Sequence, residues 1–298
     1  MLWLSPKLFE LKVDGAPASW PKTLSGLSVP LSSLQKEALQ VLAGARDQES
    51  DVAGSTPLNA SSARYSEDID IFHDRAERIA TQAESDAALL ISAGFSVKWL
   101  RQTAYVHSAA IDKDGEQTKL EWVGDSDFRF FPAVRDPLFG FRLHPLDFAI
   151  NKLFAAAGRS EPRDIYDLMV IHETIAPLSV NVWAGVEKSP GFTPEGLIAE
   201  VRRNLLHPLS AWEEVAADTK LDPKAITEKV RAALDAAEAF ATRMPTDQLG
   251  LVFLDETGRV VEPNPEKLRN YTAHKGERRE HWPTNPEITQ AMFKQLYE

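Results

Sequence analysis

The sequence contains no cysteine, and no apolar run reaches the roughly 20 residues that a membrane-spanning helix requires. Without cysteine, disulfides and thiolate-bound metals are excluded, which fits a reducing, cytoplasmic setting. The first residues, Met1 to Lys7, carry neither the basic segment nor the apolar segment of a signal peptide. We therefore expect a cytoplasmic protein that makes no contact with a membrane.

An excess of basic residues is also absent, since the 298-residue chain has a formal net charge of −11. Proteins that coat nucleic acid nonspecifically are usually basic, because their affinity comes largely from neutralising phosphates. Any contact with nucleic acid must therefore use a local basic patch. The length is sufficient for one large domain or two moderate ones.

One short segment, Arg64–Phe72, carries two carboxylates at the spacing of a strand face. Asp68 and Asp70 alternate with Ile69 and Ile71. In an extended strand, residues i and i+2 share a face, so both carboxylates point one way and the isoleucines face the core. Like charges on one face destabilise a sheet unless a cation lies between them. The pattern therefore favours a metal site over a strand with two exposed acids.

Phe72 excludes two common kinds of aspartate site. An EF-hand loop needs an oxygen ligand and then a glycine where Phe72 stands. The aspartyl nucleophile of phosphatases is disfavoured by the same residue. Fourteen residues before Asp68, Gly54 and Ser55 form a small-residue turn. Glycine allows close approach of the backbone and serine can hydrogen-bond a phosphate oxygen, so this turn predicts phosphate binding.

A two-metal site requires a further carboxylate, and Glu121 in the predicted strand 117–123 is the candidate. Two Mg²⁺ ions about 4 Å apart would neutralise a triphosphate and orient an attacking hydroxyl. The third carboxylate would then act as general base. The alternative is an exposed glutamate on a hairpin. Asp125 and Asp127 are rival candidates that lie in a predicted loop.

Two predicted helices carry further charges. Lys152 lies in the first helix, which ends at Ala157, and Arg163, Asp164 and Asp167 lie in the second. Arg163 and Asp167 are four residues apart, so an ion pair on one helix face is the simpler account. Alternatively, Lys152 binds a phosphate and is oriented by Asp167 or Asp164 across the helix pair.

The chain as a whole predicts an α+β (α/β) fold: a small mixed sheet backed by helices, followed by a helical region. Helical patterns begin at Ser32 or Ser33 and at Asp74, and strand patterns cover 95–100, 105–111 and 117–123. Beyond residue 144 the patterns are helical, apart from a hairpin at 249–262. The polar segment 269–282 predicts a solvated tail rather than an RNA-binding arm.

In their order along the chain, these segments resemble the AbiEii/AbiGii-type nucleotidyltransferase toxins, members of the DNA polymerase β-like nucleotidyltransferase superfamily. The resemblance covers about residues 35–175 and rests on five segments: Ala53–Asn59, Arg64–Phe72, Lys152–Ala156, Arg159 and Arg163–Asp167. It implies a nucleotidyltransferase-like catalytic domain over residues 1–143 and a mainly helical domain over residues 144–298.

The resemblance also implies an activity, which is the Mg²⁺-dependent transfer of a nucleoside monophosphate from a nucleoside triphosphate to an acceptor hydroxyl. The setting would be a toxin–antitoxin or phage-defence system, with a tRNA end or a protein as acceptor and a cognate antitoxin as partner. By resemblance, Asp68 and Asp70 would be metal ligands, and the strand spacing adds Glu121 as the third. Lys152 and Asp167 would join them in catalysis. The nucleotide would be bound by Gly54, Ser55, Ser66, Lys152 and Asp164.

Two alternatives remain open. A nucleotidyltransferase that modifies a small molecule, such as an antibiotic, would have a narrow pocket and no basic groove. A non-catalytic binding or regulatory member of the same fold would not bind a triphosphate in a metal-dependent way.

Overall fold

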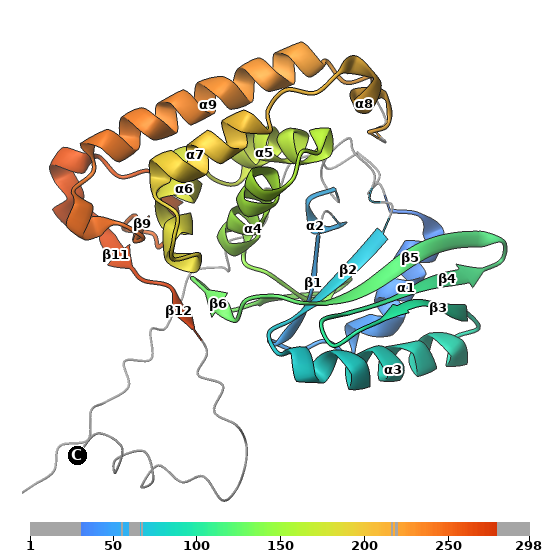
Figure 1. Ribbon diagram of the computed structural model, residues 1–298. Helices are drawn as coiled ribbons and strands as arrows, with labels where there is room; N and C mark the ends of the chain where they lie inside the picture. The colour runs from blue at the N-terminus through green and yellow to red at the C-terminus, as the bar shows by residue number, and fades with distance from the viewer. Residues whose placement is uncertain are drawn as a thin grey trace, which may run out of the picture.

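The computed structural model describes residues 31–54, 56–59, 66, 68–215, 217 and 220–278, so the predicted phosphate contact at Ser55 lies outside the described residues. Within this part of the chain, a mixed β-sheet lies between two helices on one face and a helical layer on the other (Figure 1). The expected α+β architecture is confirmed.

The sheet has seven strands among the described residues: β1 (Ser50–Ala53), β2 (Asp68–His73), β3 (Ser96–Gln102), β4 (Val106–Lys113), β5 (Glu116–Gly124), β7 (Val134–Asp136) and β8 (Gly140–Arg142). Their order is β3-β4-β5-β2-β1-β8-β7. Strand β2 runs antiparallel to β1 and parallel to β5, and this parallel register places Asp70 beside Glu121. Ile69 and Ile71 are fully buried, which confirms the predicted inward face of β2.

Helices α1 (Ser33–Ala43) and α3 (Ala76–Ser92) cover the isoleucine face of the sheet (Figure 1). Ser32 begins α1 as predicted: its side chain accepts a hydrogen bond from the backbone N–H of Gln35, and the Gln35 side chain accepts one from Ser32. Apolar residues of both helices, including Leu39 and Ile79, pack in one core with Ile71 and Trp122. The hydrophobic pattern therefore fixes which face of β2 is buried.

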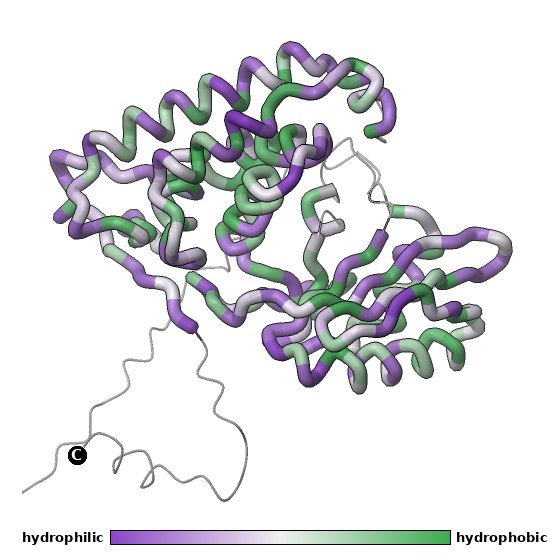
Figure 2. The backbone as a smooth tube through the Cα atoms, viewed as in Figure 1, coloured by the Kyte–Doolittle hydropathy of each residue, from purple (hydrophilic) through white to green (hydrophobic). Residues whose placement is uncertain are grey.

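The opposite face carries the short helix α2 (Thr56–Asn59) and a helical layer formed by α4 (Pro145–Gly158), α5 (Pro162–Thr174), α6 (Leu178–Lys188), α7 (Pro194–Arg203), α8 (Leu209–Glu213) and α9 (Pro223–Arg243). Helix α9 alternates between hydrophobic and hydrophilic residues along its length (Figure 2). Its apolar side joins Phe148, Leu153 and Leu168 in a second core. The predicted change to helical structure near residue 144 is confirmed by the start of α4.

The C-terminal part of the described chain contains two 3₁₀ segments, η1 (Thr246–Gln248) and η2 (Pro265–Asn270), and the strands β9 (Val252–Leu254), β10 (Val260–Val261) and β11 (Thr272–His274). Strands β9 and β10 are antiparallel, which confirms the predicted hairpin. No helix in the part of the chain that the structure describes has the length and apolar character needed to cross a membrane.

Residues 272–278 are largely exposed, as predicted for a solvated segment, but they are paired strands and not a free tail. Strand β11 pairs with β9, and β12 (Glu277–Arg278) pairs with β6 (Phe128–Arg129). The His274 ring stacks on Phe131 with 4.6 Å between ring centroids, and Gly276 leaves room for the Phe128 ring. Backbone pairing and ring contacts hold this segment, and neither contributes to a hydropathy pattern.

Candidate active site

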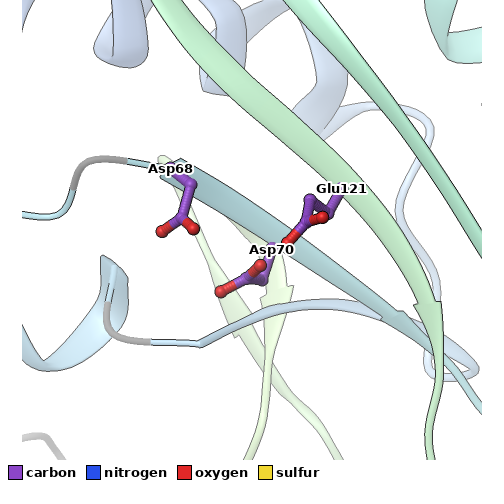
Figure 3. A group of neighbouring side chains, drawn as sticks. All are labelled: Asp68, Asp70 and Glu121. Atoms are coloured by element: carbon purple, nitrogen blue, oxygen red, sulfur yellow. The ribbon is translucent and has the colours of Figure 1, made fainter. Parts of the chain in front are cut away.

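Three carboxylates from two adjacent strands meet on the face of the sheet that carries the helical layer. Asp68 and Asp70 project from β2 and Glu121 projects from β5 (Figure 3). One oxygen of each side chain lies within 4.8 Å of the others, and all three residues are partly buried. Oxygen donors of this kind are the ligands that Mg²⁺ prefers. The parallel β2–β5 register thus brings together the three predicted metal ligands.

The Asp70 carboxyl has a raised pKa. Burial of its carboxylate, followed by the negative charges of Asp68 and Glu121, raises its pKa from 3.8 to about 7. The positive charges of Lys152 and Lys119 offset only part of this rise. A cation bound between the carboxylates would relieve the repulsion, so the electrostatics of the three acids favour a metal ion.

Gly54 follows β1 at the edge of the carboxylate cluster. Its φ angle is +66°, which favours glycine, and a Cβ atom there would lie 1.8 Å from Asp70 Oδ2. The absent side chain is therefore required for the Asp70 carboxylate to occupy its position. The close approach of Asp70 is therefore a second reason for glycine at position 54, in addition to the predicted phosphate contact.

Polar side chains hold the start of β2. The Ser66 and Thr56 hydroxyls both donate to the Asp68 carbonyl oxygen, at 2.8 and 3.0 Å. Gln35 Nε2 donates to the carbonyl oxygen of Ser66 at 2.9 Å. Ser66 is buried, and these contacts make it a support for Asp68; its contact with the nucleotide stays a prediction. The supporting roles of Thr56 and Gln35 have no signal in the sequence.

Lys152 projects from α4 and is held by Asp167 of α5, with 2.8 Å between Lys152 Nζ and Asp167 Oδ2. Asp167 is fully buried. The predicted orientation of Lys152 across the helix pair is therefore confirmed. The simpler account, an Arg163–Asp167 pair, is wrong, because Arg163 instead lies 3.9 Å from Glu161.

Asp164 is bonded to Arg159. The Arg159 guanidinium donates two hydrogen bonds to the buried Asp164 carboxylate, from Nε at 2.6 Å and from Nη2 at 2.9 Å. Two parallel bonds fix the plane of the guanidinium. Asp164 therefore orients a cation at the site.

Lys119 is a site residue that the sequence analysis missed. Its ammonium group lies 2.7 Å from Glu121 Oε1, and its position in β5 is directly opposite Asp68 in β2. The available signal was the i, i+2 spacing of Lys119 and Glu121 on one strand, which puts both on the same face.

Two connected hollows surround the carboxylates, and both include Gly54, Asp70, Glu121, Lys152 and Arg159. The small cavity, of about 210 Å³, adds Asp68, Lys119, Arg163 and Asp164. The large cavity, of about 600 Å³, adds apolar residues such as Phe72, Val123, Leu143, Phe148 and Phe154 and, at its far end, the polar residues Asp125, Ser126, Asn151, Lys188 and Ser189. Cations thus concentrate in the small cavity and apolar walls in the large one.

Comparison with protein-family models and with curated protein sequences gives no match. Among solved structures, a candidate nucleotidyltransferase from H. pylori is similar at a TM-score of 0.41 and 15% identity, covering 70% of this chain and 94% of that one. Two structures of Cid1, described as an RNA terminal uridylyl transferase and a poly(U) polymerase, are similar at a TM-score of 0.28. Their identities are 11% and 10%, and they cover 82% of this chain and 71% and 76% of their own. Likeness at these levels does not assign an activity to this chain.

Proposed function

We propose that this chain is a Mg²⁺-dependent nucleotidyltransferase that moves a nucleoside monophosphate from a nucleoside triphosphate to an acceptor hydroxyl and releases pyrophosphate. The observation that carries the proposal is the cluster of Asp68, Asp70 and Glu121 beside a cavity lined by four cationic side chains. Three carboxylates suit a hard divalent cation, and lysine and arginine side chains suit the phosphates that such a cation accompanies.

Asp68, Asp70 and Glu121 would hold the metal, proposed as two Mg²⁺ ions. When bound, Mg²⁺ supplies charge neutralisation at the triphosphate. The raised pKa of Asp70 is consistent with this assignment: burial is its main cause, and the neighbouring charges of Asp68 and Glu121 add to it.

The protein's own groups would serve the transfer as follows. The acceptor oxygen attacks the α-phosphorus as the bond to the bridging oxygen of the leaving pyrophosphate breaks, and Glu121 accepts the proton of the acceptor hydroxyl. Lys152, oriented by Asp167, and Arg159, oriented by Asp164, place positive charge on the phosphates. Such positioning costs little reorganisation when the reaction occurs, because both cations are already held by buried carboxylates.

We further propose that the enzyme acts as the toxin of a toxin–antitoxin or phage-defence system, on a tRNA end or a protein. The support for this setting is the ordered resemblance of Ala53–Asn59, Arg64–Phe72 and Arg163–Asp167 to the AbiEii/AbiGii-type toxins. A cognate antitoxin would be its further partner. A small hydroxyl compound such as an antibiotic remains the alternative acceptor.

The test is transfer of label from each of the four α-labelled nucleoside triphosphates in the presence of Mg²⁺. Three separate acceptor pools, of total tRNA, lysate protein and small hydroxyl compounds, distinguish the proposed acceptors. The Asp68→Ala/Asp70→Ala double variant should abolish transfer. Asp112→Asn is the matched control, because Asp112 lies in β4 of the same sheet and lines neither cavity.

Absence of transfer with all four nucleotides and all three pools would contradict the proposal. A cellular effect that persists in the double aspartate variant would instead support a non-catalytic binding module. Label found only in the small-molecule pool would support the proposed transfer reaction and show that the acceptor is a small hydroxyl compound.

A further inference from the structure

The large cavity extends along β5 away from the carboxylates to a polar cluster, which also borders a further hollow beyond it. Asp125 follows Glu121 by four residues, which at the rise of a strand is about 13 Å. Between them the walls are apolar and include Phe72 and Phe148. If the chain transfers nucleotides as proposed above, the cationic small cavity takes the phosphates and the apolar large cavity takes the nucleoside. The polar cluster would then face the base, since the ribose lies nearer the phosphates.

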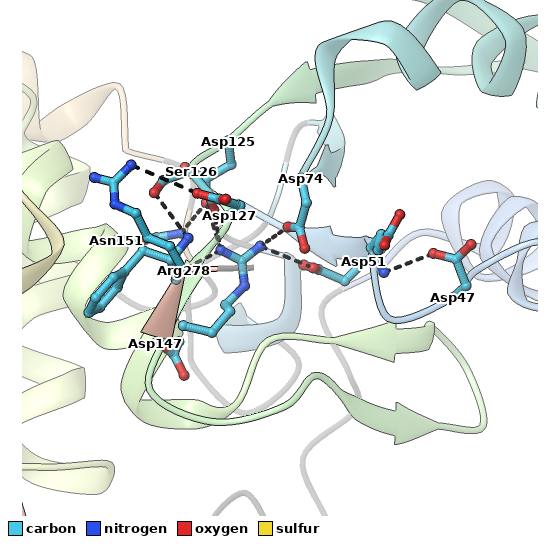
Figure 4. A network of polar contacts seen from close by, with 12 residues as sticks. Asp47, Asp51, Asp74, Asp125, Ser126, Asp127, Asp147, Asn151 and Arg278 are labelled. Carbon is cyan, nitrogen blue, oxygen red and sulfur yellow. Dashed lines mark hydrogen bonds and ion pairs between the residues drawn. The ribbon is translucent and has the colours of Figure 1, made fainter. Parts of the chain in front are cut away.

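The cluster consists of Asp125, Asn151 and Lys188, which come from the residue after β5, from α4 and from the end of α6. Figure 4 shows Asp125 and Asn151 in the polar network around them. Asn151 Nδ2 donates to Asp125 Oδ2 at 3.0 Å, and Lys188 Nζ lies 3.4 Å from the same oxygen. Lys188 also donates to Asn151 Oδ1. A guanidinium nitrogen of Arg129 lies 3.7 Å from Asp125 Oδ2. The contacts from Asn151, Lys188 and Arg129 thus converge on one oxygen of the Asp125 carboxylate.

The other oxygen of Asp125 retains the capacity to accept. The carboxylate receives a backbone hydrogen bond from Ser126, and an ionised carboxylate has about four lone-pair sites on its two oxygens. The Asp125 side chain is 20% exposed and lines the large cavity. Lys188, with three donors on its ammonium group, lines the same cavity. The cavity end therefore offers a fixed acceptor next to a fixed donor.

Buried ion pairs make this arrangement rigid. The Arg129 side chain is 6% exposed and lies 2.5 Å from Asp74 Oδ1, and Lys188 is nearly buried as well. A polar cluster whose members are held by such contacts presents its free atoms in one geometry. Positions fixed in this way can discriminate between ligands that differ by one hydrogen-bonding group.

We propose that Asp125, Asn151 and Lys188 read the nucleobase and favour bases with an exocyclic amino group. Asp125 accepts a hydrogen bond from the amino group, and Lys188 donates to the neighbouring ring nitrogen or carbonyl oxygen. In uracil the only N–H lies between two carbonyl oxygens, so its approach to Asp125 brings oxygen atoms against a carboxylate. Cytosine has an amino group next to a ring acceptor, so CTP should bind about tenfold or more tightly than UTP.

The experiment is calorimetric titration of the intact chain with CTP and UTP in Mg²⁺ buffer. ATP and ITP form a second pair that differs in the same way, with an amino or an oxo group on the ring. The wild-type chain should prefer CTP and ATP. Asp125→Asn should bring both ratios close to one, because its amide can donate as well as accept. Asp235→Asn, on the exposed side of α9, is the matched control and should keep both preferences.

Lys188→Met is the second variant. It should weaken binding of the preferred nucleotide of each pair more than that of the other, and it keeps the proposal testable if Asp125→Asn does not fold. Equal binding within both wild-type pairs, or a parallel loss of both members in the variants, would overturn base reading and leave the proposed transferase intact. Failure of all four nucleotides to bind would overturn both proposals.

Discussion

The two faces of the β2–β5 strand pair differ in whether their buried charges have compensating partners. On the face covered by α3, Asp86 is fully buried and fully bonded: Arg46 forms an ion pair with it, and Trp122 Nε1 donates to it at 2.7 Å. Gln82 adds a further hydrogen bond at 3.1 Å. The buried Asp86 charge is therefore compensated by partners within the protein.

On the opposite face, the residue next to Trp122 in β5 is Glu121, which joins Asp68 and Asp70. Here burial and like charges raise the pKa of Asp70 to about 7. A buried charge is tolerated where partners compensate it, and is costly where they do not. The first face is thus internally compensated, whereas the second has a group of carboxylates that could hold a metal ion.

The largest effect that separates the two faces should come from Asp70→Asn. Transfer should fall about 10³-fold or more, because a proposed metal ligand and its charge are lost. The same variant should melt at a higher temperature than the wild type in EDTA, since it removes the repulsion with Asp68 and Glu121. Mg²⁺ should raise the melting temperature of the wild type alone. A variant that keeps its rate would refute the metal role of Asp70.

Asp86→Asn should instead destabilise the protein. It leaves the buried Arg46 guanidinium without its counter-charge, so the free energy of unfolding should drop by about 3 kcal/mol. Urea unfolding measures this, with Glu84→Gln as control, because Glu84 is an exposed acid of the same helix. A decrease in unfolding free energy no larger than that of the control would show that the buried Asp86–Arg46 pair does not stabilise this face.

Gly54→Ala tests the fit between β1 and the carboxylates. The added methyl group would overlap Asp70 Oδ2, and alanine is strained at a φ angle of +66°. Displacement of the carboxylate by about 1 Å should lower transfer about 10²-fold. Single-turnover kinetics, with circular dichroism to verify folding, measure the effect. Wild-type rates in a folded variant would show that the close approach is not required.

The last test is a pH dependence of stability that belongs to Asp70. Between about pH 4 and pH 7 its native carboxyl holds a proton that the unfolded chain has lost, because the native pKa is raised from 3.8 to about 7. In EDTA, the unfolding free energy of the wild type relative to Asp70→Asn should therefore fall as the pH rises through this window. Thermal denaturation from pH 5 to 8 measures it. A difference that stays constant would show that Asp70 titrates normally.

The elements with the clearest periodicity were predictable from the sequence. The i, i+2 pattern of Asp68 and Asp70 placed both acids on one strand face, and helix starts such as Ser32 followed from capping chemistry. Lys119 and the cluster at Asp125 were not identified, because their roles depend on which strand lies beside which. The strand pairing of the exposed segment 272–278 was not predicted, because it depends on partner strands that are distant in the chain.

The sequence by itself determined the two carboxylates on one face of β2, the glycine that precedes them and the helices that cover the other face. These properties follow from local spacing and hydrophobic periodicity. Only the tertiary structure decided that Glu121 is the third carboxylate and that Asp167 holds Lys152. Both pairs join residues distant in the chain, and their contact depends on strand register and helix packing, which no local pattern encodes. The tertiary structure also revealed the apolar cavity that ends at Asp125, because its walls come from separate strands and helices.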